Sequence, residues 1–239
     1  MPRLLVYRIV TDMGSAPHIS DGYLSLTICK PLIRKSAEVG DYVLSLVAQS
    51  NPNIPKRHPQ RHFLAAYLFK VTEKVAMKDY EGWCKEHAPG KICTEDFWDG
   101  DCQYGSNLAW RPGPHMSSNK EIQNKLIKTN LSGVSSLISR NYAAWKSSTP
   151  HVLTDNEIEG LGLTHEEITK LGIGQKFIDL PDTTVADKLI SDWKKENDDK
   201  ILANMMNRFF ITPKGGRSIT RPRASSSRRQ SRRAHRQDR

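Results

Sequence analysis

The chain has 239 residues, of which 37% are hydrophobic and 26% are charged, and its formal net charge is +10. This length suits one domain with appendages, because a domain commonly takes ~100 to 200 residues. No uncharged apolar run approaches the ~18 residues that span a bilayer, which excludes a membrane protein. The four cysteines occur without a secretory signal, so we expect an intracellular, reduced protein.

The positive charge is concentrated at the C-terminal end. Residues 213–239 hold ten Lys and Arg and one acidic residue, whereas residues 1–212 hold 26 basic and 25 acidic ones. Repeated Arg, Ser and Gly with few apolar side chains cannot offset the entropy of ordering, so we expect a disordered tail. We therefore divide the chain into a folded part, 1–212, and this tail. The tail arginines should bind nucleic acid without sequence preference, as in Arg228, Arg229, Arg232 and Arg233. In a eukaryotic cell such a tail also indicates nuclear import.

The N-terminal half predicts a sheet. Apolar runs bounded by turn residues predict strands over residues 3–10, 23–28, 42–47 and 62–71. Pro31 suits the first turn of a short helix that carries Arg34 outward. The loop at 50–61 is basic and is either solvated or a nucleic-acid contact. Residues 76–87 predict a helix and residues 88–116 a loop-rich segment.

The second half reads as helical, chiefly over residues 150–212. Thr154 to Leu163 is echoed by Thr164 to Ile173, and each copy begins with a Thr-x-x-Glu capping box and ends near a glycine. These features predict two short helices. The end of the second copy, residues 171–176, also resembles the turn of a helix-hairpin-helix, although ordinary helix termination is the alternative. Asp182 then predicts the start of another helix.

The stretch from Asp12 to Asp41 carries a recognisable pattern. It contains Asp-x-Gly-x-Ala-Pro from Asp12, Cys-Lys-Pro-x-Ile-Arg from Cys29, and Gly40-Asp41. At these residues the chain resembles the nucleotide modification associated domain family, second type. The resemblance covers roughly residues 4 to 145, and it implies a link to making or handling modified nucleotides in DNA. The Gly-Asp turn also looks like one in barrel folds of the PUA, ASCH and EVE kind, so we expect an α+β fold, mixed, with a barrel-like sheet.

Charged residues in this stretch are the first candidates for a site. Asp12, Arg34 and Asp41, together with Lys30, can orient a base edge and its phosphate. If the chain is an enzyme, Asp12 and Asp41 are the acid/base candidates. The alternative is an Arg–carboxylate pair that pins the turns.

Aromatic residues in the loop-rich segment could stack on a base. Trp98 and Trp110 lie among polar residues, and Asp101 and Tyr104 lie between them. A base held between an aromatic face and polar edges is how flipped or single-stranded nucleotides are read. We therefore add these four residues to the predicted site.

Metal and cofactor chemistry find little support. Cys84, Cys93 and Cys102 are nine residues apart, which does not match the short Cys-x-Cys spacings of zinc sites. Cys29 is a nucleophile or, more simply, a small buried residue. No phosphate-binding loop, dinucleotide fingerprint or serine elbow occurs, and we expect no cofactor and no metal.

Three functions remain open. The first is a module that binds DNA or nucleotides and recognises or helps produce a modified base. The second is a nucleotide-modifying enzyme, with an Asp as acid/base and Arg34 on phosphate. The third is a protein-interaction domain whose tail supplies affinity for acidic partners. The sequence leans away from an enzyme, since it contains no complete catalytic set.

Overall fold

The computed structural model describes residues 1–12, 14–52, 54–55, 58–94, 100–111, 117–172 and 174–209, with only the backbone over 198–209. Residues 1–199 form one compact unit, which contains all the sheets and sites described below. Of the second unit, residues 200–239, the described part is helical backbone as far as Phe209. No helix in the described ranges is both long and apolar enough to cross a membrane.

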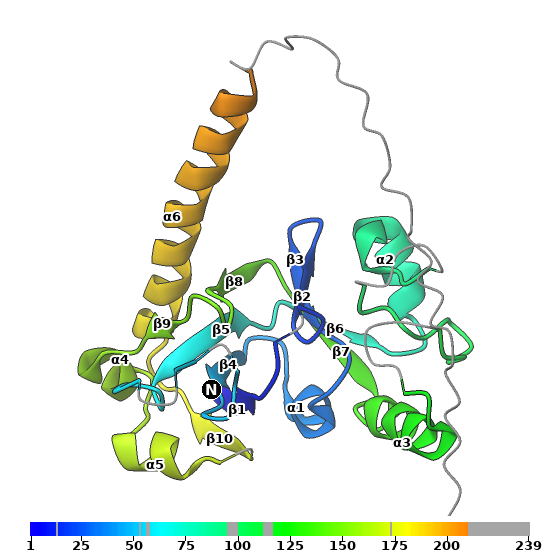
Figure 1. Cartoon of the computed structure of the whole chain (residues 1–239), viewed down its shortest axis with the longest axis horizontal. Helices are drawn as coiled ribbons and strands as arrows, with labels where there is room; N and C mark the ends of the chain where they lie inside the picture. Colours follow the sequence, from blue (N-terminus) through cyan, green and yellow to red (C-terminus); the bar gives the residue numbers. More distant parts are fainter. Residues whose placement is uncertain are drawn as a thin grey trace, which may run out of the picture. The chain divides into compact units, whose positions relative to one another are not determined.

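A six-stranded sheet forms the centre of the compact unit (Figure 1). Its main path runs β10-β1-β4-β5-β8, and the short β9 pairs with β5 beside β8. β1 and β4 are parallel, and the other neighbours are antiparallel. The strands are β1 (Arg3–Ile9), β4 (Tyr42–Val47), β5 (Leu64–Lys70), β8 (Asn141–Ala144), β9 (His151–Val152) and β10 (Gln175–Asp179).

A second sheet of four strands continues from the first. Its order is β2-β3-β7-β6, and all pairs are antiparallel. The strands are β2 (His18–Ser20), β3 (Tyr23–Leu26), β6 (Glu73–Ala76) and β7 (Ser135–Ser139).

Two strand pairs pass from one sheet into the other. β5 runs almost directly into β6 and β7 into β8, so the same two chain segments pair as β5·β8 in the first sheet and as β6·β7 in the second. At the bend, Thr72 N donates to Ile138 O at 2.9 Å. The described strands therefore make a bent, open arrangement of two sheets. The expected α+β class is confirmed, but the described strands form no closed barrel.

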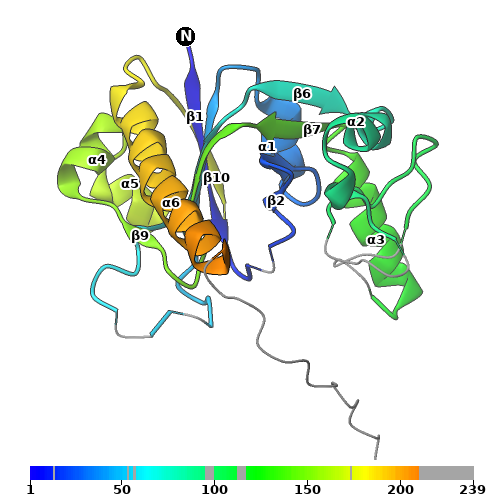
Figure 2. The ribbon, with the colours of Figure 1, turned by 90° about the horizontal axis from the view of Figure 1, so that it is seen from above.

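Helices cover both faces of the six-stranded sheet. Figure 2 shows α4, α5 and α6 on one side of β1 and β10, with α1 and the second sheet on the other. The helices are α1 (Pro31–Ser36), α2 (Tyr80–His87), the 3-10 turn η1 (Pro89–Lys91), α3 (Lys120–Leu131), α4 (Asp155–Gly160), α5 (His165–Lys170) and α6 (Thr184–Phe209).

Alternation along the strands produces two cores. On β1, Leu4 and Val6 face the helices, whereas Leu5 and Tyr7 face α1 and the second sheet. A strand buried on both faces reads as a continuous apolar run, which explains why β1 and β4 are recognisable in the sequence. The C-terminal end of β1 thus lies between two packed layers.

The four predicted N-terminal strands are present, with ends one to two residues shorter in three of them. The predicted helix at 76–87 is confirmed over 80–87, but residues 73–76 form strand β6. The second half is less helical than expected, because it supplies β7 to β10. The helix-hairpin-helix interpretation is wrong, since α5 is followed by strand β10, which pairs with β1.

Both predicted capping boxes are confirmed. The Thr154 hydroxyl accepts from Glu157 N, and the Glu157 carboxylate accepts from Thr154 N at 2.7 Å. Thr164 and Glu167 repeat the arrangement at the start of α5. Ile158 and Ile168, one from each helix, are buried in the same core, so the caps hold two short helices against the sheet.

We expect Thr154→Ala and Thr164→Ala each to lower the free energy of unfolding by ~0.5 to 2 kcal/mol, because each leaves a helix amide uncapped. Denaturant titration followed by circular dichroism measures the change. A matched control is Thr149→Ala, whose exposed hydroxyl donates to a turn carbonyl outside any helix. Equal stability of the three variants would contradict the role of the caps.

Candidate functional site

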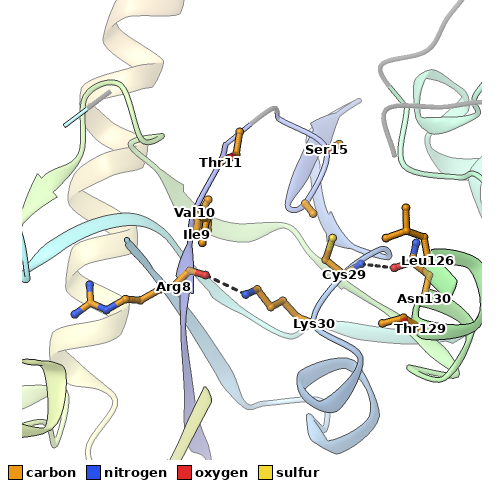
Figure 3. A pocket seen from close by; sticks show the side chains of 11 residues that line it. Arg8, Ile9, Val10, Thr11, Ser15, Cys29, Lys30, Leu126, Thr129 and Asn130 are labelled. Carbon is orange, nitrogen blue, oxygen red and sulfur yellow. Dashed lines mark hydrogen bonds between the residues drawn. The ribbon is translucent and has the colours of Figure 1, made fainter. Parts of the chain in front are cut away.

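A pocket of about 400 Å³ opens where β1 ends. Its walls come from three segments: the end of β1 with the loop that follows, the turn after β3, and helix α3 (Figure 3). The lining residues, which define the Lys30 pocket, are Arg8, Ile9, Val10, Thr11, Ser15, Ala16, Cys29, Lys30, Leu126, Thr129 and Asn130.

The turn after β3 has an unusual backbone. Cys29 and Lys30 both adopt the left-handed conformation, with φ of 60° and 43°. Non-glycine residues rarely take this conformation, and they keep it only where the surroundings hold them. Cys29 N donates to Asn130 Oδ1 at 2.9 Å, which ties the turn to α3. Pro31 then begins α1 directly behind the turn, as predicted.

Lys30 is the charged group that the pocket presents. Its Nζ donates to the Arg8 carbonyl at 3.0 Å and lies 4.8 Å from the centre of the Tyr7 ring. Burial lowers the pKa of the Lys30 amine from its ordinary value. The Arg8 side chain, by contrast, points away to the other side of β1, so Arg8 lines this pocket with its backbone (Figure 3).

Arg34 does not point outward, as the sequence suggested, but is fully buried. Its Nε donates to Cys29 O at 2.8 Å, one terminal nitrogen donates to Ser135 O at 3.0 Å, and the other donates to Asn130 O. The six-residue helix α1 exposes Leu32 and Lys35 instead. Burial lowers the Arg34 pKa to about 10, so the side chain remains charged at neutral pH. We call this set of contacts the Arg34 bracket.

Asp12 has protein partners on the loop side of the pocket. Its carboxylate accepts from the Tyr67 hydroxyl at 3.0 Å and from Ser147 N at 2.9 Å. Gly14 N, in the same loop, donates to it at 3.2 Å. Burial, together with the Asp12 charge, raises the pKa of Tyr67 well above its ordinary value, so this hydroxyl is a permanent donor. Asp12 therefore anchors the loop that follows β1.

Asp41 pairs with Arg3 rather than with Arg34. The two form a salt bridge of 2.6 Å, and Asp41 also accepts from Arg3 N and Glu38 N, both at 2.9 Å. Asp41 lines a separate hollow near the N-terminus. Asp12, Arg34 and Asp41 thus have separate sets of partners, and of the four charged residues predicted together only Lys30 lines the pocket.

The predicted residues of the loop-rich segment lie in another part of the unit. Asp101 is fully buried and accepts from Ser25 Oγ at 2.7 Å and from the Tyr80 hydroxyl at 3.0 Å. Tyr104 is buried and forms a β-bridge with Trp110, which packs partly buried against the same cluster. Trp98 and the tail arginines lie outside the described residues.

The cysteines form no disulfide with one another. Cys84 and Cys102 lie in one apolar cluster, and Cys93 Sγ donates to Gly100 O at 2.9 Å. Within the described ranges, no group of three or more His, Cys, Asp or Glu is arranged to hold a metal ion. Burial raises the pKa of Cys29, which opposes thiolate formation in the Lys30 pocket.

Comparison with known proteins addresses the whole compact unit. The sequence model of one family, nucleotide modification associated domain 2, matches residues 1–199. The chain belongs to this family. The match confirms the resemblance found in the first half of the chain and extends it through α4, α5 and the start of α6. Neither the curated proteins nor the solved structures that were searched contain a match.

The family assignment links the chain to nucleotide modification, and the family pattern lies close to the Lys30 pocket. Ala16, Cys29 and Lys30 belong to the pattern and line the pocket, and Arg34 lies behind it. Sequence reasoning missed α3, which contributes Leu126, Thr129 and Asn130 to the lining. Its signal was Asn119, which caps α3 by accepting from Glu121 N and Ile122 N.

The Arg34 bracket leaves no room beside Gly133. A methyl group at this glycine would overlap the Arg34 guanidinium. We therefore expect Gly133→Ala to reduce the free energy of unfolding by ~1 to 3 kcal/mol, the usual cost of overpacking. Denaturant titration measures the loss. The control is Gly82→Ala in α2, where a methyl group meets nothing within 4 Å and where alanine should add up to ~1 kcal/mol. Loss of stability in Gly82→Ala alone would contradict a rigid bracket.

Proposed function

We propose that this domain binds a modified base or nucleotide of nucleic acid in the Lys30 pocket. The observation that carries the proposal is the pocket itself: a hollow of about 400 Å³ beside the family pattern, with one lysine presented to mostly uncharged walls. Small-molecule pockets commonly measure ~300 to 1,000 Å³ and combine apolar walls with a few polar groups. The family assignment supports a nucleotide as the occupant.

The walls suit a flat, partly apolar ligand. Ile9, Val10, Ala16 and Leu126 offer apolar surface, and Thr11, Ser15 and Thr129 offer hydroxyl groups. A base needs both, since its faces are apolar and its edges carry donors and acceptors. The Lys30 ammonium is a donor only, so it would bind a carbonyl or phosphate oxygen of the ligand.

Contacts within the protein favour binding over catalysis. Arg34, which the enzyme alternative assigns to phosphate, is buried and donates to main-chain carbonyls. Asp12, the proposed acid or base, already accepts from Tyr67 and Ser147. Incubation of the protein with a panel of nucleotides, followed by mass spectrometry, separates the two alternatives. A mass change would favour the enzyme.

Lys30→Ala should lower the affinity for a modified oligonucleotide by about tenfold or more, because a hydrogen bond to a charged group contributes ~1.5 to 3 kcal/mol. Fluorescence anisotropy with a panel of oligonucleotides carrying modified pyrimidines or purines, each paired with its plain counterpart, measures the preference.

The matched control is Lys35→Ala. Lys35 lies on the exposed side of α1, makes the same change in net charge and is not part of the pocket lining. An equal preference for modified over plain oligonucleotide in both variants would remove Lys30 from the site.

The basic tail would supply a second, non-specific contribution. Residues 213–239 carry most of the net charge, so their removal should abolish most binding to unmodified DNA. For every phosphate that the tail neutralises, its removal should reduce the steepness of log K against log salt by ~0.7 to 0.9. Salt titrations of the full chain and the truncated chain measure both slopes. An unchanged slope would contradict this role of the tail.

A further inference from the structure

A second cavity lies at the same end of β1, near the Arg8 side chain. It measures about 250 Å³ and is lined by Arg8, Ala48, Gln49, Ser50 and Gly172. Figure 3 shows that the Arg8 side chain and Lys30 lie on opposite sides of β1. We call this second hollow the Arg8 cavity.

The Arg8 guanidinium is a buried charge without a counter-charge. The residue is 2% exposed. Its terminal nitrogens donate to Val47 O at 2.9 Å, to His62 O at 3.2 Å and to Ile168 O at 2.7 Å. These carbonyls orient the group but do not neutralise it, and no carboxylate of the described residues forms a salt bridge with it. Buried charges are normally paired, because the loss of water costs several kcal/mol per ion.

The surroundings of the cavity add positive charge. Gln49 Oε1 accepts from Arg61 at 2.6 Å, and Gln49 Nε2 contacts His62 Nδ1 at 2.7 Å. Burial and the charges of Arg8 and Arg61 lower the pKa of His62 below its ordinary value. Gln49 is therefore the neutral side chain around which these groups gather.

The shape of the cavity also depends on glycine. Gly172 follows α5 with a φ of +55°, a conformation that residues with side chains rarely adopt. This residue lines the cavity opposite the Ala48–Ser50 turn, so no side chain from the end of α5 fills the space at that position.

We propose that the Arg8 cavity binds a phosphate group. A guanidinium held by carbonyls, beside an arginine-bound glutamine, is well suited to a tetrahedral oxyanion. The phosphate would supply the counter-charge that Arg8 lacks. It belongs either to a polynucleotide backbone or to a free phosphate compound. The inference goes beyond the proposed function and does not depend on what the Lys30 pocket binds.

The first experiment uses the full wild-type chain and His62 as a local reporter. Nuclear magnetic resonance titration gives the His62 pKa with and without inorganic phosphate. A bound anion favours the imidazolium, so phosphate should raise this pKa, and the shift should saturate with a single affinity. An unmoved His62 pKa at saturating phosphate would overturn the proposal.

The second experiment compares Gln49→Glu with Gln60→Glu. Both change one neutral amide to a carboxylate in the same loop, but Gln60 is exposed and does not line the cavity. A carboxylate at position 49 would pair with the cationic groups and repel an anion, so the Kd for phosphate should rise about tenfold or more. The control should bind phosphate like the wild type. Equal Kd values in the two variants would overturn the proposal.

Two further arms identify the source and keep the two proposals apart. If Gln49→Glu weakens binding of a plain single-stranded oligonucleotide more than Gln60→Glu does, the phosphate belongs to a polynucleotide. If it weakens only inorganic phosphate, the ligand is a free phosphate compound. Lys30→Ala should leave phosphate binding unchanged, so failure of the Lys30 pocket proposal would not be mistaken for failure of this one.

Discussion

The arrangement of the Lys30 pocket depends on a charge that is not part of its lining. The Arg34 guanidinium supplies donors to three main-chain carbonyls, from the turn after β3, the end of α3 and the start of β7. Without those donors the carbonyls would be buried and unsatisfied, which is why the three segments must stay in register. Cys29 and Asn130 belong both to this bracket and to the pocket wall. The family pattern around Arg34 is thus explained by architecture, and the adjacent lysine is left as the group exposed to a ligand.

Sheet topology explains where the cavities occur. Among the described strands, β1 and β4 are the parallel pair, and both cavities lie beyond their carboxyl ends. Chains that leave parallel strands must diverge, which opens space between their loops. The loop after β1 turns toward the second sheet, and the residues after β4 form the Ala48–Ser50 turn. Asp12 and Tyr67 hold the first of these loops against β5.

Local signals predicted the parts of this fold that local forces decide. The continuous apolar runs of β1 and β4 and the two capping boxes depend on neighbouring residues, and all were recognisable. Strands β6 to β10 were missed because they are short and gain their stability from partners far along the chain. The same limit applies to the site. Lys30 was found from its pattern, but the burial of Arg34 depends on Asn130 and Ser135, about one hundred residues away. The partner of Asp41 is Arg3, and nothing in their spacing distinguishes it from Arg34.

Arg8 has one more consequence. Its carbonyl accepts from Lys30 in one cavity, and its guanidinium lines the other. Ligands in the two cavities would therefore act on opposite ends of the same residue. Any free energy that couples them is reciprocal by thermodynamic linkage: the factor by which an anion at the guanidinium changes affinity for a base equals the factor by which the base changes affinity for the anion. A single residue of β1 would in that case make the two sites cooperative without any rearrangement of the sheet.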